Sequence, residues 1–532
     1  MQEIIALAEF VSKNKIKKIE QVALKGKAKT HIKVLYELLS NGKGVDEEEL
    51  ATTFYGDNPN RGLYYSRLKR QLRDRLVNTI FLIDANQPVF NDYQKAYYSC
   101  YKDMVAAKIL LGRHARPAAI PLAQETLKKA LRFGFTDIIL GIARDLQGHY
   151  GGLTGDKKKY IEYQKIVLEY TNVYFAELKA EEYYLAITFN YAKSLGSKVE
   201  LADLAQQYYE ELVIIMKETQ SYRLNYLFYQ ISLLRYEITN DYENTLKVCK
   251  EALDFFQSNE RFVAHSQTVA VLFMNKSLAC HLRLQQHAEG EELSLKALQS
   301  VPEGSINWFN TLYYYITICF HSKQYQKAFQ IYTQATGHPK FKHLIQNKSE
   351  EWNIFQAYVH YFILLGKIKP DPLKSNLPRF RANKFLNEVP TFSQDKQGAN
   401  ISILILQILF LLAQGDYNMI IDRVESLNMY THRYLRKDDT FRSNCFIKML
   451  LQLPQGNFVY KPVMRKVHRY WEALQSMPLK TARQNAELEV VPYEILWEFV
   501  AASLKGAPSL QEPDQLTNRH LMPQRMAASG KA

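Results

Sequence analysis

The chain has 532 residues, of which 47% are hydrophobic and 23% are charged, and these ordinary globular values exclude a mainly disordered protein. Its net charge of +14 is dispersed, with no run of five or more like charges, so we interpret it as a mildly basic, solvated surface. The longest apolar run, residues 401–413, is too short to span a bilayer, and the N-terminus lacks the order of a signal peptide. Together these features predict a cytoplasmic protein without a membrane partner.

The five cysteines lie far apart in apolar helical contexts and form neither a CxxC pair nor a Cys/His metal spacing. We therefore expect neither a disulfide framework nor a zinc site. The chain is rich in aromatic residues, with 36 Tyr and 27 Phe, and several tyrosines are clustered, as in residues 313–315. We interpret these clusters as packing between helices rather than as a binding stripe, because a tyrosine can bury its ring and keep its hydroxyl in water.

The first predicted region, residues 1–92, is rich in lysine and carries three helical patterns. The first pattern covers about residues 31–40. Asp46 has the properties of an N-cap for a second helix that ends at Gly56. A longer helix follows from Asn60, with apolar residues at four-residue spacing: Leu68, Leu72, Leu76 and Ile80.

From residue 93 to 366 a degenerate motif recurs about every forty residues, which is typical of stacked supersecondary units. Its clearest copies are Tyr325, Ala328, Tyr332 and Ala335; His287, Gly290, Ser294 and Ala297; and Tyr242, Thr245, Cys249 and Ala252. Strand patterns are nearly absent. The sequence therefore predicts an all-α fold, a right-handed helical-repeat solenoid of about eight helix pairs behind a small N-terminal module.

The regular pattern stops at residues 367–398, where four prolines and several basic residues predict a loop-rich insertion. Helix pairing resumes over residues 399–504, which we interpret as a C-terminal repeat with capping helices. Within it, the apolar run at 401–413 predicts a buried helix. Residues 505–532 contain prolines and few large apolar residues, so we expect a disordered tail.

The spacing of Tyr325, Ala328, Tyr332 and Ala335 resembles that of the tetratricopeptide family, whose members carry small residues where the two helices of a unit touch. The resemblance covers about residues 98–430, and the longer period leaves armadillo- or HEAT-type stacking open. It implies a groove that binds a protein or peptide and is lined by the first helix of each unit. By position, the candidate groove residues are Gln230, Asn275, Lys276 and Tyr314. Among them, Asn275 and Lys276 match, in one unit alone, the Asn and Lys with which some family members clamp a C-terminal carboxylate.

The N-terminal region resembles the winged-helix module that precedes tetratricopeptide-like arrays in some bacterial transcriptional activators. The matching stretches are residues 34–39, 46–51, 54–57 and 65–72. The resemblance implies that the helix from Asn60 is a recognition helix. Its basic residues would then contact phosphates or base edges in the major groove: Arg67, Lys69, Arg70 and Arg73. The family's hairpin wing has no counterpart here, because residues 78–83 continue apolar, and a basic helix face also suits a solvated surface.

The motifs of phosphate loops, zinc proteases, nucleophile elbows and dinucleotide-binding folds are all missing, and the 13 histidines are scattered. We therefore predict a protein that is not an enzyme and needs no cofactor, metal or small-molecule substrate. Two functions stay open. The first is an interaction scaffold or adaptor with a protein or peptide in the solenoid groove. The second is a transcriptional regulator that binds DNA through its N-terminal module.

Overall fold

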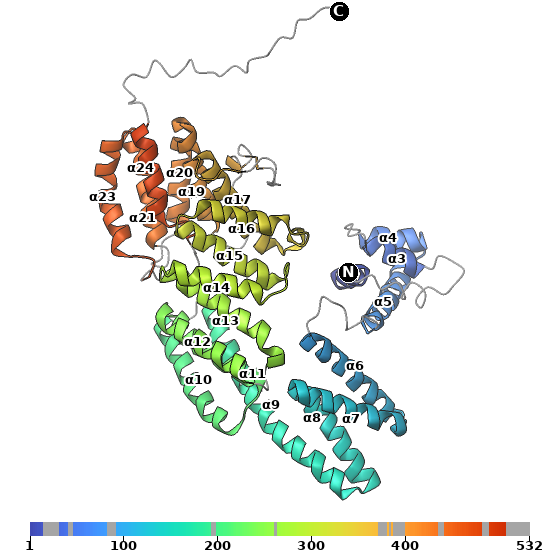
Figure 1. Cartoon of the computed structure of the whole chain (residues 1–532). Coiled ribbons are helices and arrows are strands. Elements are labelled where there is room, and N and C mark those ends of the chain that lie inside the picture. Colours follow the sequence, from blue (N-terminus) through green and yellow to red (C-terminus); the bar gives the residue numbers. More distant parts are fainter. Residues whose placement is uncertain are drawn as a thin grey trace, which may run out of the picture. The chain divides into compact units, whose positions relative to one another are not determined.

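The computed structural model describes most of the chain: residues 1–13, 31–40, 46–81, 92–192, 198–259, 263–370, 380–381, 385–386, 399–434, 441–480 and 489–506. Every regular element in these residues is a helix, and none is a strand, which confirms the predicted all-α class (Figure 1). The chain divides into two compact units, Met1–Phe175 and Ala176–Ala532, which we call unit 1 and unit 2. Each is described by itself.

Unit 1 begins with four helices: α1 (Gln2–Lys13), α3 (His31–Ser40), α4 (Glu47–Tyr55) and α5 (Arg61–Ile80). Three of them lie where the sequence predicts helices. The Asp46 side chain caps α4 by accepting from the Glu48 N–H at 3.2 Å, and Gly56 ends α4 at a positive φ of 58°. Helix α1 was not predicted from the sequence, and it packs Ile4, Ala8 and Val11 against α3 and α5. Residues 41–45 lie outside the described residues.

The rest of unit 1 consists of longer helices that pack on their neighbours in the chain: α6 (Asp92–Gly112), α7 (Arg116–Phe133), α8 (Thr136–His149), a π-helical turn (Tyr150–Thr154) and the first half of α9 (Lys157–Ala192). Their core is separate from that of α1–α5 and includes Cys100, Ala123, Ile139 and Leu146. The boundary between the units falls inside α9, at a position that the sequence analysis does not predict.

Unit 2 continues with a run of helices in which each packs on the next: α10 (Lys198–Glu218), α11 (Tyr222–Glu237), α12 (Tyr242–Ser258), α13 (Val263–Arg283), α14 (His287–Gln299), α15 (Ile306–His321), α16 (Tyr325–Gly337), a 3-10 turn (Phe341–His343) and α17 (Gln346–Leu364). Residues 240–241 lie between α11 and α12, and residues 303–304 lie between α14 and α15. In addition, α13 contacts α15 directly.

The motif residues form the buried sides of α12, α14 and α16. Ala328 and Ala335 on α16 are 0% exposed, as are Ser294 and Ala297 on α14. Gly290 lies so close to α15 that a Cβ there would meet the Ile318 side chain at 2.9 Å. The motif therefore marks the small residues at which α12, α14 and α16 approach their neighbours.

The last part of unit 2 contains α19 (Ala399–Gln414), α20 (Tyr417–Tyr434), α21 (Phe441–Leu450), α22 (Gln452–Gln455), α23 (Tyr460–Ser476) and α24 (Tyr493–Gly506). The apolar run at 401–413 lies within α19 and is almost entirely buried, as predicted. One large core joins these helices to α15, α16 and α17. Most of the predicted insertion at 367–398, and the tail from residue 507, lie outside the described residues.

All five cysteines are buried, and none forms a disulfide bond. Burial raises the pKa of the Cys100 thiol to about 11 and those of Cys249 and Cys319 to about 12. The pKa values of Cys280 and Cys445 are raised for the same reason. These side chains therefore act as small apolar packing residues.

Candidate functional site

A pocket of about 710 Å³ lies within unit 2. Its walls come mainly from alternate helices of the run, α11, α13, α15 and α17, with residues of α12 and the end of α9. Asn275, Lys276 and Ala279 face it from α13, and Asn307, Asn310 and Tyr314 face it from α15. Its volume lies within the range of pockets that hold small molecules or short segments of a partner.

One ion pair joins two walls of the pocket. Lys276 Nζ on α13 lies 2.8 and 3.0 Å from the two carboxylate oxygens of Glu237 at the end of α11. Burial would lower the pKa of Lys276, but the Glu237 carboxylate outweighs it, and the pKa is raised. Lys276 is therefore charged at neutral pH, and its charge is already compensated by the protein.

The other charged side chains of the pocket are also engaged. On α17, Lys348 Nζ lies 3.0 and 2.9 Å from the carboxylate oxygens of Glu351, one helical turn away. Arg283 at the end of α13 is 7% exposed, and its guanidinium lies over the Tyr242 ring at 5.9 Å. The charges of the two lysines are thus compensated by glutamates of the same pocket, and Arg283 adds one further positive charge to its wall.

Four asparagine side chains reach the pocket, and some of their hydrogen-bonding groups have no partner among the described residues. Asn275 Oδ1 accepts from the Thr311 hydroxyl at 2.9 Å, which links α13 to α15. Asn240 Oδ1 accepts from the Tyr242 hydroxyl at 3.1 Å, whereas Asn240 Nδ2 is buried without a hydrogen-bond partner. Whichever way that amide is turned, one of its ends is unpaired. The side chains of Asn307 and Asn310 form no hydrogen bond with any residue that the structure describes.

Two tyrosines and one cysteine of the pocket have raised pKa values. Burial raises the pKa values of Tyr313, Tyr314 and the Cys280 thiol, so all three keep their protons at neutral pH. In its present form the arrangement offers hydrogen bonds and aromatic surface to a ligand. Among the described residues, no three His, Cys, Asp or Glu side chains are grouped as a metal site would require.

Three of the four groove residues predicted from the sequence, Asn275, Lys276 and Tyr314, line this one pocket. Gln230 does not. It is 7% exposed on α11, and its Nε2 is buried without a hydrogen bond. Sequence reasoning missed the residues that complete the pocket, above all Glu237, Asn240, Asn307 and Asn310. The spacing of Asn307 and Asn310, one turn apart on a helix that neighbours α13, is the signal that would have found two of them.

The basic residues predicted to contact DNA lie on α5, where they separate into two pairs. Lys69 Nζ lies 2.5 Å from Glu47 on α4, and Arg73 Nε lies 2.8 Å from Glu3 on α1. Arg67 and Arg70 are exposed and form no ion pair with any residue that the structure describes. The four side chains therefore do not present one uniform basic face.

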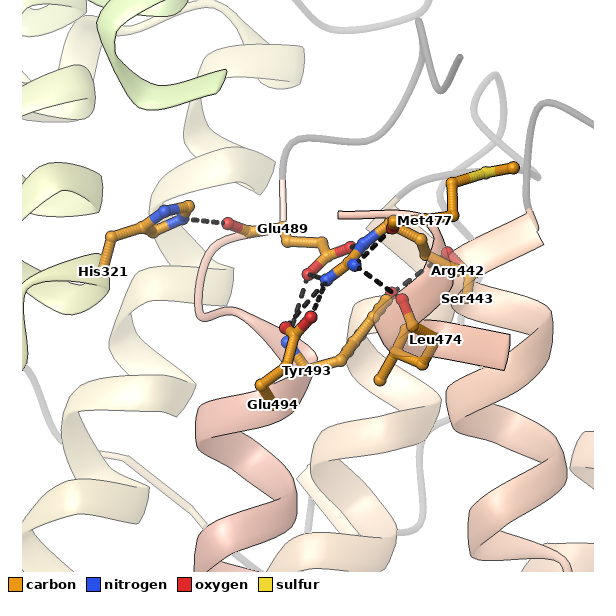
Figure 2. A network of polar contacts seen from close by, with 8 residues as sticks. All are labelled: His321, Arg442, Ser443, Leu474, Met477, Glu489, Tyr493 and Glu494. Carbon is orange, nitrogen blue, oxygen red and sulfur yellow. Dashed lines mark hydrogen bonds and ion pairs between the residues drawn. The ribbon is translucent and has the colours of Figure 1, made fainter. Parts of the chain in front are cut away.

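A second polar cluster of unit 2 surrounds the buried side chain of Arg442. Figure 2 shows Arg442 on α21 between Glu489 and Glu494, with its side chain 0% exposed. Nε donates to Glu489 at 2.6 Å, Nη2 to both carboxylates, and Nη1 to the carbonyls of Leu474 and Met477. Burial raises the pKa of Glu489, and the bonds from Arg442 oppose this shift, while the two carboxylates raise the pKa of Arg442.

His321 extends this cluster to α15. Its Nε2 donates to the Glu489 carbonyl oxygen at 2.6 Å, and its Nδ1 is buried without a partner (Figure 2). Burial lowers the pKa of His321 to about 3, so the ring is neutral at ordinary pH. The cluster joins the last helices of the chain to the run that carries the pocket.

No protein-family model, curated protein or solved structure matches this chain. No helix among the described residues combines the length and the apolar character needed to cross a bilayer.

Proposed function

We propose that this chain is a non-enzymatic interaction protein, a tetratricopeptide-like solenoid that takes up a segment of a protein partner in the pocket of unit 2. The alternation of the wall helices supports this proposal. In a stack of helix pairs the first helices share one face, and that shared face is where such arrays bind extended partners.

One observation carries the proposal: polar groups of α13, of α15 and of the turn after α11 converge on a single pocket, and three of its asparagines keep groups that no described residue pairs. Buried polar groups are normally paired within a protein. Asn240 departs from that rule, and Asn307 and Asn310 line the same pocket with amides that are free to bond a partner, as expected of a surface that receives another molecule.

A pocket-filling substitution tests the proposal. Ala279 lines the pocket on α13, so Ala279→Trp should occupy its space without removing a hydrogen bond. We expect random peptides displayed on phage to be enriched by the purified chain, and binding of the selected peptides to be lost in Ala279→Trp. Ala288→Trp is the matched control, because Ala288 is exposed on α14 outside the pocket. Failure to enrich any peptide, or equal binding by both variants, would refute the proposed function.

A second candidate function, DNA binding through the N-terminal module, is favoured by the exposure of Arg67 and Arg70 on α5. Phosphate contacts make DNA affinity depend on salt. Each neutralised phosphate contributes about 0.9 to the slope of log affinity against log salt concentration. If both arginines contact phosphates, changing both to Ala should reduce the slope by about two units in titrations with duplex DNA.

The paired residues of the same helix supply the control for DNA binding. Lys69 and Arg73 are held by Glu47 and Glu3, so changing both to Ala should alter the slope less than removing Arg67 and Arg70. Equal, weak binding by wild type and both double variants would mean that only the dispersed charge of the chain attracts DNA, and would exclude this function.

A further inference from the structure

The pocket of unit 2 contains two kinds of polar group, and they point to different ligands. Its lysines are paired with glutamates of the same pocket: Lys276 with Glu237, and Lys348 with Glu351. Its asparagines instead keep hydrogen-bonding capacity that the protein does not use. The distinction decides whether the ligand is recognised by charge or by neutral hydrogen bonds.

The ion pairs argue against a charged ligand group. A carboxylate that approached Lys276 would have to displace Glu237, which accepts at 2.8 and 3.0 Å, and would then be repelled by it. The same holds for Lys348 and Glu351. A free C-terminus therefore gains little from the two lysines, although Asn275 and Lys276 match a carboxylate clamp by position.

The asparagines suit a neutral ligand that offers both donors and acceptors. A carboxamide has one acceptor oxygen and two donor hydrogens, the same groups that a peptide bond presents. Asn307 and Asn310 lie one turn apart on α15, and Asn275 is tied to the same helix through Thr311. An extended chain exposes its N–H and C=O groups at regular intervals along its edge, so a row of carboxamides can pair with consecutive peptide bonds.

We propose that the pocket binds an internal, extended segment of a partner polypeptide through its main-chain amides, and does not require a terminal carboxylate. This inference rests on the proposed function and specifies the ligand of the same site. The side chains of the segment lie against the apolar and aromatic parts of the wall, which include Leu272 and Tyr313.

Pairs of synthetic peptides test the inference directly. Each peptide selected by phage display is made with a free C-terminal carboxylate and with a C-terminal amide, and both are titrated against the full chain by fluorescence anisotropy. We expect the two dissociation constants to agree within about threefold, because a terminal charge adds no contact. Lys276→Met should likewise change affinity by less than about threefold.

Asn310→Asp supplies the positive test, since it keeps the shape of the side chain but removes its donors and adds a charge. We expect affinity to fall at least about tenfold, the loss of one well-made hydrogen bond to a buried group. Asn428→Asp, exposed on α20 outside the pocket, is the matched control and should leave affinity unchanged.

Two results would overturn the inference while leaving peptide binding intact. One is a carboxylate form that binds more than about tenfold tighter than the amide and loses that advantage in Lys276→Met. The other is equal affinity for wild type and Asn310→Asp. Absence of any selected peptide would overturn the inference together with the proposed function.

Discussion

In the pocket of unit 2, Asn307 and Asn310 have carboxamides that bond to no described residue, whereas in the cluster around Arg442 every guanidinium nitrogen donates a hydrogen bond. The pocket side chains remain partly exposed, with 41% of the Lys276 side chain accessible, while Arg442 and Glu489 are 0% exposed. The cluster around Arg442, whose hydrogen-bonding groups are paired, is suited to holding helices together. The pocket, where some hydrogen-bonding groups lack partners, is suited to receiving another molecule. Stability measurements can separate these two roles.

The largest effect is expected for Arg442→Met. The substitution keeps an unbranched apolar stem but leaves the buried Glu489 carboxylate without its partner, and breaking such a pair costs about 3–5 kcal/mol. We expect a loss of this size in the free energy of unfolding in urea. All four tryptophans lie between residues 308 and 497, so tryptophan fluorescence follows unit 2 alone.

A double variant separates the charge effect from the packing effect. Adding Glu489→Gln to Arg442→Met removes the uncompensated carboxylate and should recover part of the loss. If Arg442→Met alone cost less than about 1 kcal/mol, the cluster would not stabilise the fold, and the contrast with the pocket would disappear.

A smaller, pH-dependent effect is expected from His321. Its folded-state pKa of about 3 lies below the ordinary value of about 6.5, so the unfolded chain binds a proton that the folded chain does not. The contribution of His321 to stability is complete above about pH 6.5 and is lost by about 1.4 kcal/mol per pH unit as the pH falls toward 3. Positive charge on the ring is opposed first by burial, and then by His287, Arg283 and Arg442.

Urea titrations of the same fluorescence at pH 7, 6 and 5 measure this slope. His321→Gln can keep the donor to the Glu489 carbonyl oxygen but cannot titrate. The difference between wild type and variant in the pH dependence of the unfolding free energy therefore isolates the contribution of His321. The pKa of His287, whose ring centroid lies 5.9 Å from that of His321, is also lowered by burial and contributes to both curves. Parallel curves for the two proteins would contradict the prediction.

The smallest effect is expected for Lys276→Met, which removes the ion pair with Glu237. Because the lysine side chain is 41% exposed and the glutamate 24%, water compensates most of the lost attraction, and the pair contributes about 1 kcal/mol or less. The measurement is again the urea transition of unit 2. A loss as large as that of Arg442→Met would make the pocket a structural element and would remove the distinction between the two clusters.

The sequence predicted those features that depend on neighbours in the chain. Apolar periodicity identified most helices, Asp46 and Gly56 marked the ends of α4, and the repeated small residues marked the buried sides of α12, α14 and α16. Position within a repeat placed Asn275 and Lys276 on the face that forms the pocket. These predictions succeed because helix geometry translates spacing directly into a shared face.

Features that depend on how helices dock could not be read in this way. Lys69 lies 22 residues from Glu47, and Arg442 lies 47 residues from Glu489, so their pairing follows from how separate segments of the chain dock. Asn240 escaped notice because it lies in the turn after α11, at a positive φ of 61°, and not on a helix face. Burial of Gln230 likewise reflects packing that a single helix cannot reveal.

The buried thiols have a practical consequence. Maleimides and similar reagents attack the exposed thiolate form, and all five native cysteines are covered and hold their protons well above neutral pH. The native cysteines should therefore react little when an introduced cysteine is labelled. A cysteine introduced at the exposed Ala288 would react far faster than the native ones. A dye attached there on α14 could then report on a partner segment bound to unit 2, and no native cysteine would have to be replaced.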